Sequence, residues 1–488
     1  MRNILFFAGL AVLSYGCGPH TVKKNDKQRV IRQQVGVPLS YALADQDCQN
    51  SQKEVAISSQ SIFEWNGKTT SRTKHDFVDT KTKESIQTNH ISQSVYNLHQ
   101  LTTENCSIIN GDTVCKKVGK TQNVTTADNI RICDAERKFP RESIEAVTLT
   151  SLAHLQQANQ FYLTIPSAKP SIRDAALIVL PKIETNYVKR NDDGSNIQLK
   201  TMITDNAAFG ELSQGQHVFI VFPKSEEFKQ DEKWQDINLW EIPYVMSHEY
   251  AHQIFLTHYE NYSADASAMA NFKLGNSILK QRNSPPWNNA PAGLQLTSGD
   301  SGRSLALGAI NEGFADLIGF YATGDSTTTT KDLPCFERSR DIHTSEFFDG
   351  TPKVLLELYA KSFLGGLSVS SSEEYDCEKF DVSDSHQIGA IFAYAMNQIF
   401  ESHLGDQSSP ETKTELALTW LNNLNKKRNI QSAPSGDRIF EITLLALAET
   451  VKISDKTLSQ THCDILNATF PSYGHVVTES ERWSCAAE

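Results

Sequence analysis

A His-Glu-x-x-His pattern is the part of this 488-residue chain whose residue types and spacing point most directly to chemistry. It reads His248-Glu249-Tyr250-Ala251-His252. Residues four apart lie on the same face of an α-helix, so two imidazoles with this spacing can bind one Zn²⁺ through their ring nitrogens. Glu249 lies beside the first histidine, where its carboxylate can take a proton from a metal-activated water. The pattern therefore predicts a zinc-binding helix that carries its own general base.

The third metal ligand has two candidates, and the first is His258. It lies ten residues after His248, which is the spacing of the third ligand in the metzincin peptidases. That geometry requires the helix to stop after His252, normally at a glycine, and Phe255 occupies the glycine position. If the helix continues, His258 lies about 240° around the helix axis from His252 and points away from the metal.

Glu312 is the favoured candidate for the third ligand. It stands in an apolar, helix-like run that continues to Gly319, and acidic residues in such a run are costly to bury unless they are paired or bound to a metal. Asp316 follows one turn later on the same helix face, where it can accept the free ring N–H of a ligand histidine and fix the orientation of that ring. Two exposed acids on an ordinary helix are the alternative interpretation.

The order of these motifs resembles that of the gluzincins, and specifically of the thermolysin-like metallopeptidases. Two further sites carry the resemblance, which covers roughly residues 150–450. Asn206 and Ala207 are similar to the edge strand of that family, which implies that they hold the backbone of an extended peptide. His386 resembles the family histidine that stabilises the oxyanion of the reaction, with Asp381 holding it in place.

The resemblance implies a fold class, a cofactor and an activity. The expected fold is α+β, a two-lobed zincin with a mixed-sheet N-lobe, a helical C-lobe and the zinc helix between them. The expected cofactor is one catalytic Zn²⁺, and the expected function is that of an endopeptidase that hydrolyses protein or peptide substrates. Two alternatives stay open: a metzincin-type peptidase that uses His258, and a catalytically silent zincin-fold lipoprotein with a binding or structural role. The presence of Glu249 argues against the second.

The amino terminus predicts export. Residues 1–16 read as a signal peptide whose apolar core is too short to span a bilayer. Leu13-Ser14-Tyr15-Gly16-Cys17 resembles a bacterial lipobox, which implies lipid on Cys17, a flexible tether over residues 17–35, and attachment to a membrane. We expect an exported lipoprotein at the outer membrane, in the periplasm or at the cell surface. A plain secretory signal is the alternative.

Cysteine usage is consistent with an oxidising compartment. The chain has nine cysteines, and removing Cys17 leaves eight, which predicts four disulfides. Cys106 and Cys115 flank an Asn-Gly hairpin turn and form the best-supported pair. Assigning the others by region gives Cys48–Cys133, Cys335–Cys377 and Cys463–Cys485, and other pairings stay open.

Composition and hydrophobic spacing predict the domain organisation. The net charge of −12 argues against nucleic acid as a partner, and we expect a monomer. Residues 36–140 read as a small β-rich domain. Its role stays open between a propeptide-like chaperone, a surface-binding module, a structural brace and a bound inhibitor. Residues 141–488 read as the metallopeptidase domain, with a sheet lobe over about 141–255 and a helical lobe over about 256–488. Apolar spacing predicts helices at 141–162, 388–399 and 439–451 and strands at 176–180 and 217–222.

Overall fold

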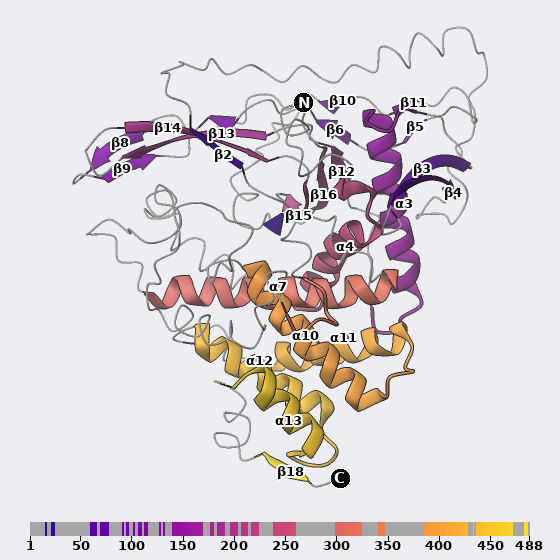
Figure 1. Ribbon diagram of the computed structural model, residues 1–488, viewed down its shortest axis with the longest axis vertical. Coiled ribbons are helices and arrows are strands. Elements are labelled where there is room, and N and C mark those ends of the chain that lie inside the picture. Colours follow the sequence, from indigo (N-terminus) through magenta and orange to yellow (C-terminus); the bar gives the residue numbers. More distant parts are fainter. Residues whose placement is uncertain are drawn as a thin grey trace. The chain divides into compact units, whose positions relative to one another are not determined.

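Helices and strands occur together in the computed structural model, which has seven α-helices and several small sheets within the described residues (Figure 1). This mixture is compatible with the α+β class that the sequence predicts. The structure describes residues 15–16, 21–24, 59–65, 69–77, 90–91, 94–96, 101–102, 106–109, 112–115, 126–127, 130–131, 139–168, 176–179, 183–190, 196–203, 206–212, 216–223, 238–259, 298–324, 340–346, 385–427, 433, 436–471 and 483–486.

The chain divides into two compact units. The first comprises Met1–Gln160 and Ser171–Tyr250, and the second comprises Phe161–Pro170 and Ala251–Glu488. The division falls within α4 (Pro243–His258), so this helix begins in the first unit and ends in the second.

A mixed six-stranded sheet organises the first unit. Its strand order is β1-β15-β16-β12-β6-β10, with β12 parallel to β16 and β15 antiparallel to it. Three successive residues of β16 (Phe219, Ile220 and Val221) are buried, as expected of a strand covered on both faces. Both strands predicted from apolar runs are confirmed. The strand bounds are β1 (Tyr15–Gly16), β6 (Ser94–Tyr96), β10 (Thr126–Ala127), β12 (Ala176–Val179), β15 (Asn206–Leu212) and β16 (Gln216–Phe222).

Smaller sheets complete the strands of the first unit. A four-stranded sheet has the order β2-β14-β13-β7, formed by β2 (Thr21–Lys24), β7 (Leu101–Thr102), β13 (Ile183–Arg190) and β14 (Asn196–Ile203). Antiparallel pairs form between β3 (Ser59–Trp65) and β4 (Thr70–Asp76), between β5 (His90–Ile91) and β11 (Ile130–Arg131), and between β8 (Cys106–Ile109) and β9 (Asp112–Cys115). The β8–β9 pair confirms the predicted hairpin, with Cys106 directly opposite Cys115. Their disulfide stays a prediction.

Helix α3 (Ile144–Leu163) is the long helix of the amino-terminal half, and it agrees with the helix predicted at 141–162. Ser143 lies just before it and accepts the Ala146 N–H at 3.2 Å, which satisfies one of the free donors at the helix start. Val147, Leu149 and Leu155 are buried, so the apolar residues that predict the helix also form its packed surface.

The second unit is built from helices. They are α7 (Ser298–Thr323), α10 (Ser385–Leu404), α11 (Pro410–Lys426), α12 (Gly436–Val451) and α13 (Gln460–Thr469). Aromatic rings fill the space between them: Phe314 of α7 stacks on Trp420 of α11, and Phe392 of α10 contacts Trp420 and Phe440. Both helices predicted for this region are present: residues 388–399 lie within α10, and residues 439–451 form all but the first three residues of α12.

A disulfide fastens the carboxyl-terminal segment. Cys463 of α13 is bonded to Cys485 of β18 (Ser484–Ala486), which pairs with β17 (Thr457–Ser459). This is the pairing that the sequence predicts. The other cysteines of the predicted set, Cys17, Cys48, Cys133, Cys335 and Cys377, lie outside the described residues.

Candidate metal centre

Helix α4 carries the His-Glu-x-x-His pattern, as the sequence predicts. A short 3-10 helix, η2 (Leu239–Glu241), leads into it, and Pro243 occupies the first position of α4, where its missing N–H costs nothing. His248 and Glu249 are wholly buried, and His252 is 2% exposed. Burial of three polar side chains on one helix is costly unless they have partners or a ligand.

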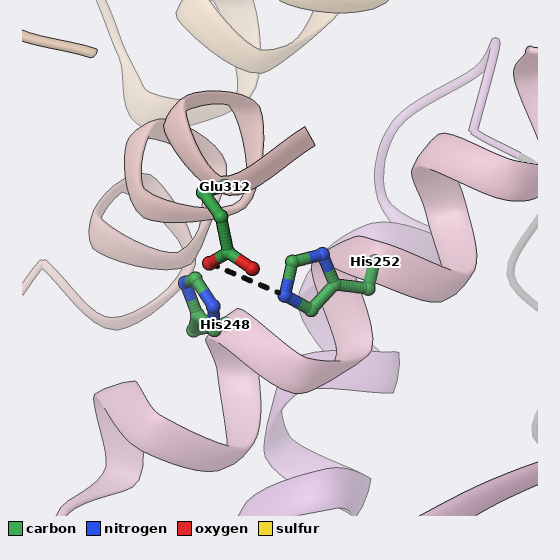
Figure 2. Close-up of side chains that lie close together, drawn as sticks. All are labelled: His248, His252 and Glu312. Atoms are coloured by element: carbon green, nitrogen blue, oxygen red, sulfur yellow. Dashed lines mark ion pairs between the residues drawn. The ribbon is translucent and has the colours of Figure 1, made fainter. Parts of the chain in front are cut away.

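The two histidines meet Glu312 of α7. One ligand atom from each of His248, His252 and Glu312 can be chosen so that all three atoms lie within 4.8 Å of one another. Figure 2 shows both rings on one helix and the carboxylate approaching them from the other. The Glu312 Oε2 atom lies 3.7 Å from His252 Nε2. The described residues therefore bring together the three side chains that the sequence predicts as ligands, in a group that could hold a metal ion.

Asn311 orients the second histidine. Its side-chain Oδ1 lies 3.1 Å from His252 Nδ1, so a proton on Nδ1 can be donated to this oxygen. With that tautomer, Nε2, the nitrogen that faces Glu312, is the ring atom that could bind a metal ion. Sequence reasoning did not assign a role to Asn311, although it stands immediately before Glu312. A polar side chain next to a buried ligand is the signal that could have identified it.

Arg340 is the second residue that sequence reasoning missed. Its guanidinium is wholly buried and donates to Glu312 Oε2 at 3.2 Å and to Asp316 Oδ1 at 2.6 and 2.9 Å. The turn that follows is fixed by Asp341, which accepts the His343 N–H at 2.8 Å. No spacing rule links Arg340 to α7, because the contact exists only in the folded chain.

The charges of the cluster fit a divalent cation. Among the described residues at this site, three buried carboxylates, Glu249, Glu312 and Asp316, stand against one buried guanidinium, Arg340. In their ionised forms these carboxylates outnumber the guanidinium by two, and a buried excess of negative charge favours a cationic ligand. A divalent metal ion would offset this difference, with neutral imidazoles as its further donors.

His386 also lies at this cluster. It occupies the first turn of α10, and its Nε2 atom is 3.5 Å from Glu312 Oε1. Its side chain is 13% exposed, whereas that of Glu312 is fully buried. His386 is therefore the more accessible of the two side chains.

Two glycines allow α10 to approach α7 this closely. A Cβ atom on Gly389 would lie 2.8 Å from Glu312 Cβ and 2.9 Å from the Ala309 carbonyl oxygen, and one on Gly313 would lie 2.5 Å from the Gly389 carbonyl oxygen. These distances are shorter than carbon contacts allow. The helices thus touch backbone to backbone, one turn from His386 and next to Glu312.

The remaining predicted residues fall in three places. His258 is the last residue of α4, which continues without a stop after His252, so the turn that a metzincin-type ligand needs is not formed. Asp316 pairs with Arg340, and its predicted bond to a ligand histidine stays a prediction. Asp381 lies outside the described residues.

Strand β15 contains Asn206 and Ala207. It pairs with β16 on one side, and on the other with β1, where Gly16 and Tyr15 lie opposite Ala208 and Phe209. Because these two partners belong to the predicted signal peptide, its removal would leave β15 as the edge of the sheet.

Comparisons with known proteins give no further assignment. No protein-family model, no curated protein and no solved structure matches this chain. Among the helices that the structure describes, none is long and apolar enough to cross a membrane.

Proposed function

We propose that this chain is an exported zinc endopeptidase of the thermolysin-like gluzincin type, with a two-lobed zincin fold. The single observation that supports it most is the buried group of His248, His252 and Glu312, with Glu249 next to the first ligand. A purely structural zinc site has no need of a carboxylate base beside an open ligand position. A catalytically silent zincin fold is the second candidate, and the test below separates the two.

The positions of the side chains support one mechanism. His248, His252 and Glu312 would hold the Zn²⁺, which supplies Lewis acidity toward a peptide carbonyl and lowers the pKa of water. Glu249 takes the proton from the attacking water and passes it to the leaving amine. His386 donates a hydrogen bond to the oxyanion that develops on the carbonyl. Asn311 and Arg340 hold His252 and Glu312 in orientation throughout.

The substrate is an extended peptide. An edge strand binds such a peptide through its backbone, and in this proposal β15, with Asn206 and Ala207, provides that edge once the signal peptide has been removed. A lipid on Cys17 would anchor the enzyme to a membrane surface.

The test is digestion of an unfolded protein by residues 18–488, with zinc quantified in the same samples. The matched control is Glu249→Gln, which keeps the size of the side chain and removes the base. We expect cleavage by the wild type only, and about one zinc per chain in both proteins. Zinc without cleavage in the wild type would favour the catalytically silent alternative, and absence of zinc from both proteins would overturn the metal site.

A further inference from the structure

The start of the metal-binding helix is held by an ion pair between the buried Glu241 and the part-exposed Arg141. Glu241, the last residue of η2, is wholly buried two residues before α4 begins at Pro243. Its carboxylate accepts two hydrogen bonds from Arg141, each 2.5 Å long, and one from the Thr70 hydroxyl at 2.9 Å. The Asn238 N–H adds a fourth at 3.4 Å. A carboxylate so enclosed fixes the position of η2.

The donors to Glu241 come from distant parts of the sequence. Thr70 lies on β4 of the β3–β4 hairpin, 171 residues before Glu241, and Arg141 lies just before α3, 100 residues before it. Loss of either donor leaves a buried carboxylate with fewer partners, which lowers the stability of the fold substantially. Glu241 therefore joins the hairpin and the start of α3 to the segment that leads into α4.

Packing of the hairpin strengthens this attachment. The Phe63 ring of β3 lies edge-on to the buried Trp240 ring of η2, with ring centres 6.4 Å apart. The Phe63 N–H donates to the Thr150 hydroxyl of α3 at 3.1 Å. Arg72 lies over the Phe63 ring and donates to the Phe139 carbonyl at 3.2 Å. The hairpin is thus packed on α3 and η2 together, and Figure 1 shows it alongside α3.

Continuous hydrogen bonds connect η2 to the first turn of α4. The Ile242 N–H donates to the Leu239 carbonyl at 3.1 Å, and the Val245 N–H donates to the Ile242 carbonyl at 3.0 Å. Tyr244, in the first turn, is wholly buried, and its ring centre lies 5.9 Å from that of His248. A displacement of η2 would therefore move the turns that carry His248.

We propose that the β3–β4 hairpin is a permanent brace of the metal-binding helix. Thr70, Arg141 and Glu241 act as positioning residues that hold η2, and through it the turns of α4 that place His248. The effect on metal binding rests on the proposed zinc site, whereas the bracing of α4 does not. A brace is required in the active form, whereas an inhibitory propeptide must leave it.

The test compares two isosteric substitutions on one strand of the full chain. Thr70→Val removes the bond to Glu241 and the bond that the same hydroxyl accepts from Arg141 Nη2 at 2.9 Å. Thr73→Val removes a bond to Glu64, 3.3 Å long, that stays within the hairpin. Amide hydrogen exchange of the zinc-free proteins reports on α4 without any metal. We expect exchange at residues 242–248 to accelerate about tenfold in Thr70→Val, as for loss of a hydrogen bond to a charged group. Thr73→Val should leave these residues unchanged.

Zinc affinity gives the second readout. Thr70→Val and Glu241→Gln should both raise the Kd for zinc several-fold, and Thr73→Val should not. Equal exchange at residues 242–248 in both threonine variants would overturn the proposal, and so would a higher turnover in Thr70→Val, which an inhibitory segment predicts. If the wild type binds no zinc, the proposed function fails, and the exchange comparison alone decides whether the hairpin braces α4.

Discussion

Glu312 is the residue on which the buried cluster converges. Its Oε2 atom faces both Arg340, at 3.2 Å, and His252, at 3.7 Å, and its Oε1 atom lies 3.5 Å from His386. One carboxylate thus connects the proposed metal, a fixed positive charge and the proposed oxyanion donor. Removing it would leave the Arg340 guanidinium with Asp316 as its remaining carboxylate partner at this site among the described contacts.

Substitution of the two candidate third ligands should give opposite results. Glu312→Ala should weaken zinc binding by more than the roughly 10- to 100-fold that loss of an outer-sphere partner costs, because it removes a direct ligand. His258→Ala should keep the zinc affinity of the wild type, because α4 continues to this residue without the turn that a third ligand requires. Competition with a chromogenic chelator measures both constants. Full affinity in Glu312→Ala together with loss in His258→Ala would favour the metzincin-type alternative.

At the scale of elements, the crossing of α7 and α10 sets the distance between His386 and Glu312. The two glycines at the crossing let the backbones touch, so any side chain added there must separate the helices. Sequence alone predicts both helices and singles out both residues as candidates for the site. It does not predict that Gly313 lies against Gly389, because helix contacts depend on crossing geometry rather than on local spacing.

Gly389→Ala should therefore lower kcat strongly and lower the free energy of unfolding only moderately. A methyl group 2.8 Å from Glu312 Cβ must push the helices apart, and a displacement of about 1 Å in a catalytic group can cost on the order of 10²-fold in rate. The stability loss should be about 1–3 kcal/mol, as for other overpacked cores. The measurements are kcat and urea unfolding.

The control for this crossing is Ala395→Gly, at another buried position of α10. This substitution should cost about 1 kcal/mol of stability, because glycine has a lower helix propensity than alanine. It should lower stability and leave kcat near that of the wild type. Combining Gly389→Ala with His386→Ala should add little to the kcat loss of His386→Ala alone. Additive losses would mean that the glycine does not act through His386.

At the scale of the whole molecule, stability should depend on a buried histidine of α3 that is not one of the candidate metal ligands. His154 of α3 is 1% exposed, and burial, with the neighbouring His75, lowers the pKa of its imidazole to about 3. The unfolded chain keeps the ordinary value of 6.5 and takes up the proton first. The stability from neutral His154 is thus fully present above pH 6.5 and is lost as the pH falls toward 3.

His154→Gln should flatten this pH dependence. Between pH 6.5 and pH 3 the wild type should lose unfolding free energy relative to the variant. The relative loss should total on the order of a few kcal/mol, because one pKa unit corresponds to about 1.4 kcal/mol. Urea unfolding of zinc-free protein at several pH values measures it without interference from metal release. Parallel pH curves for the two proteins would show that His154 does not titrate with folding.

The sequence predicts the local parts of this molecule better than the distant ones. The spacing of His248 and His252, the acid in an apolar run at Glu312 and the strand-like run of β16 are local patterns, and the structure contains each. The partners of Glu241 and the position of Arg340 depend on segments brought together by folding, so no periodicity reveals them. A buried charge such as Glu241 signals that partners exist, but it does not say which residues they are.

The most direct test of the central claim is an X-ray structure of the zinc-loaded protein with anomalous data at the zinc edge. The proposal predicts one peak bound by ring nitrogens of His248 and His252 and by a carboxylate oxygen of Glu312, at about 2.0–2.2 Å, with a fourth position facing Glu249. A peak bound by His258, a site with four protein ligands, or no peak at α4 would contradict it.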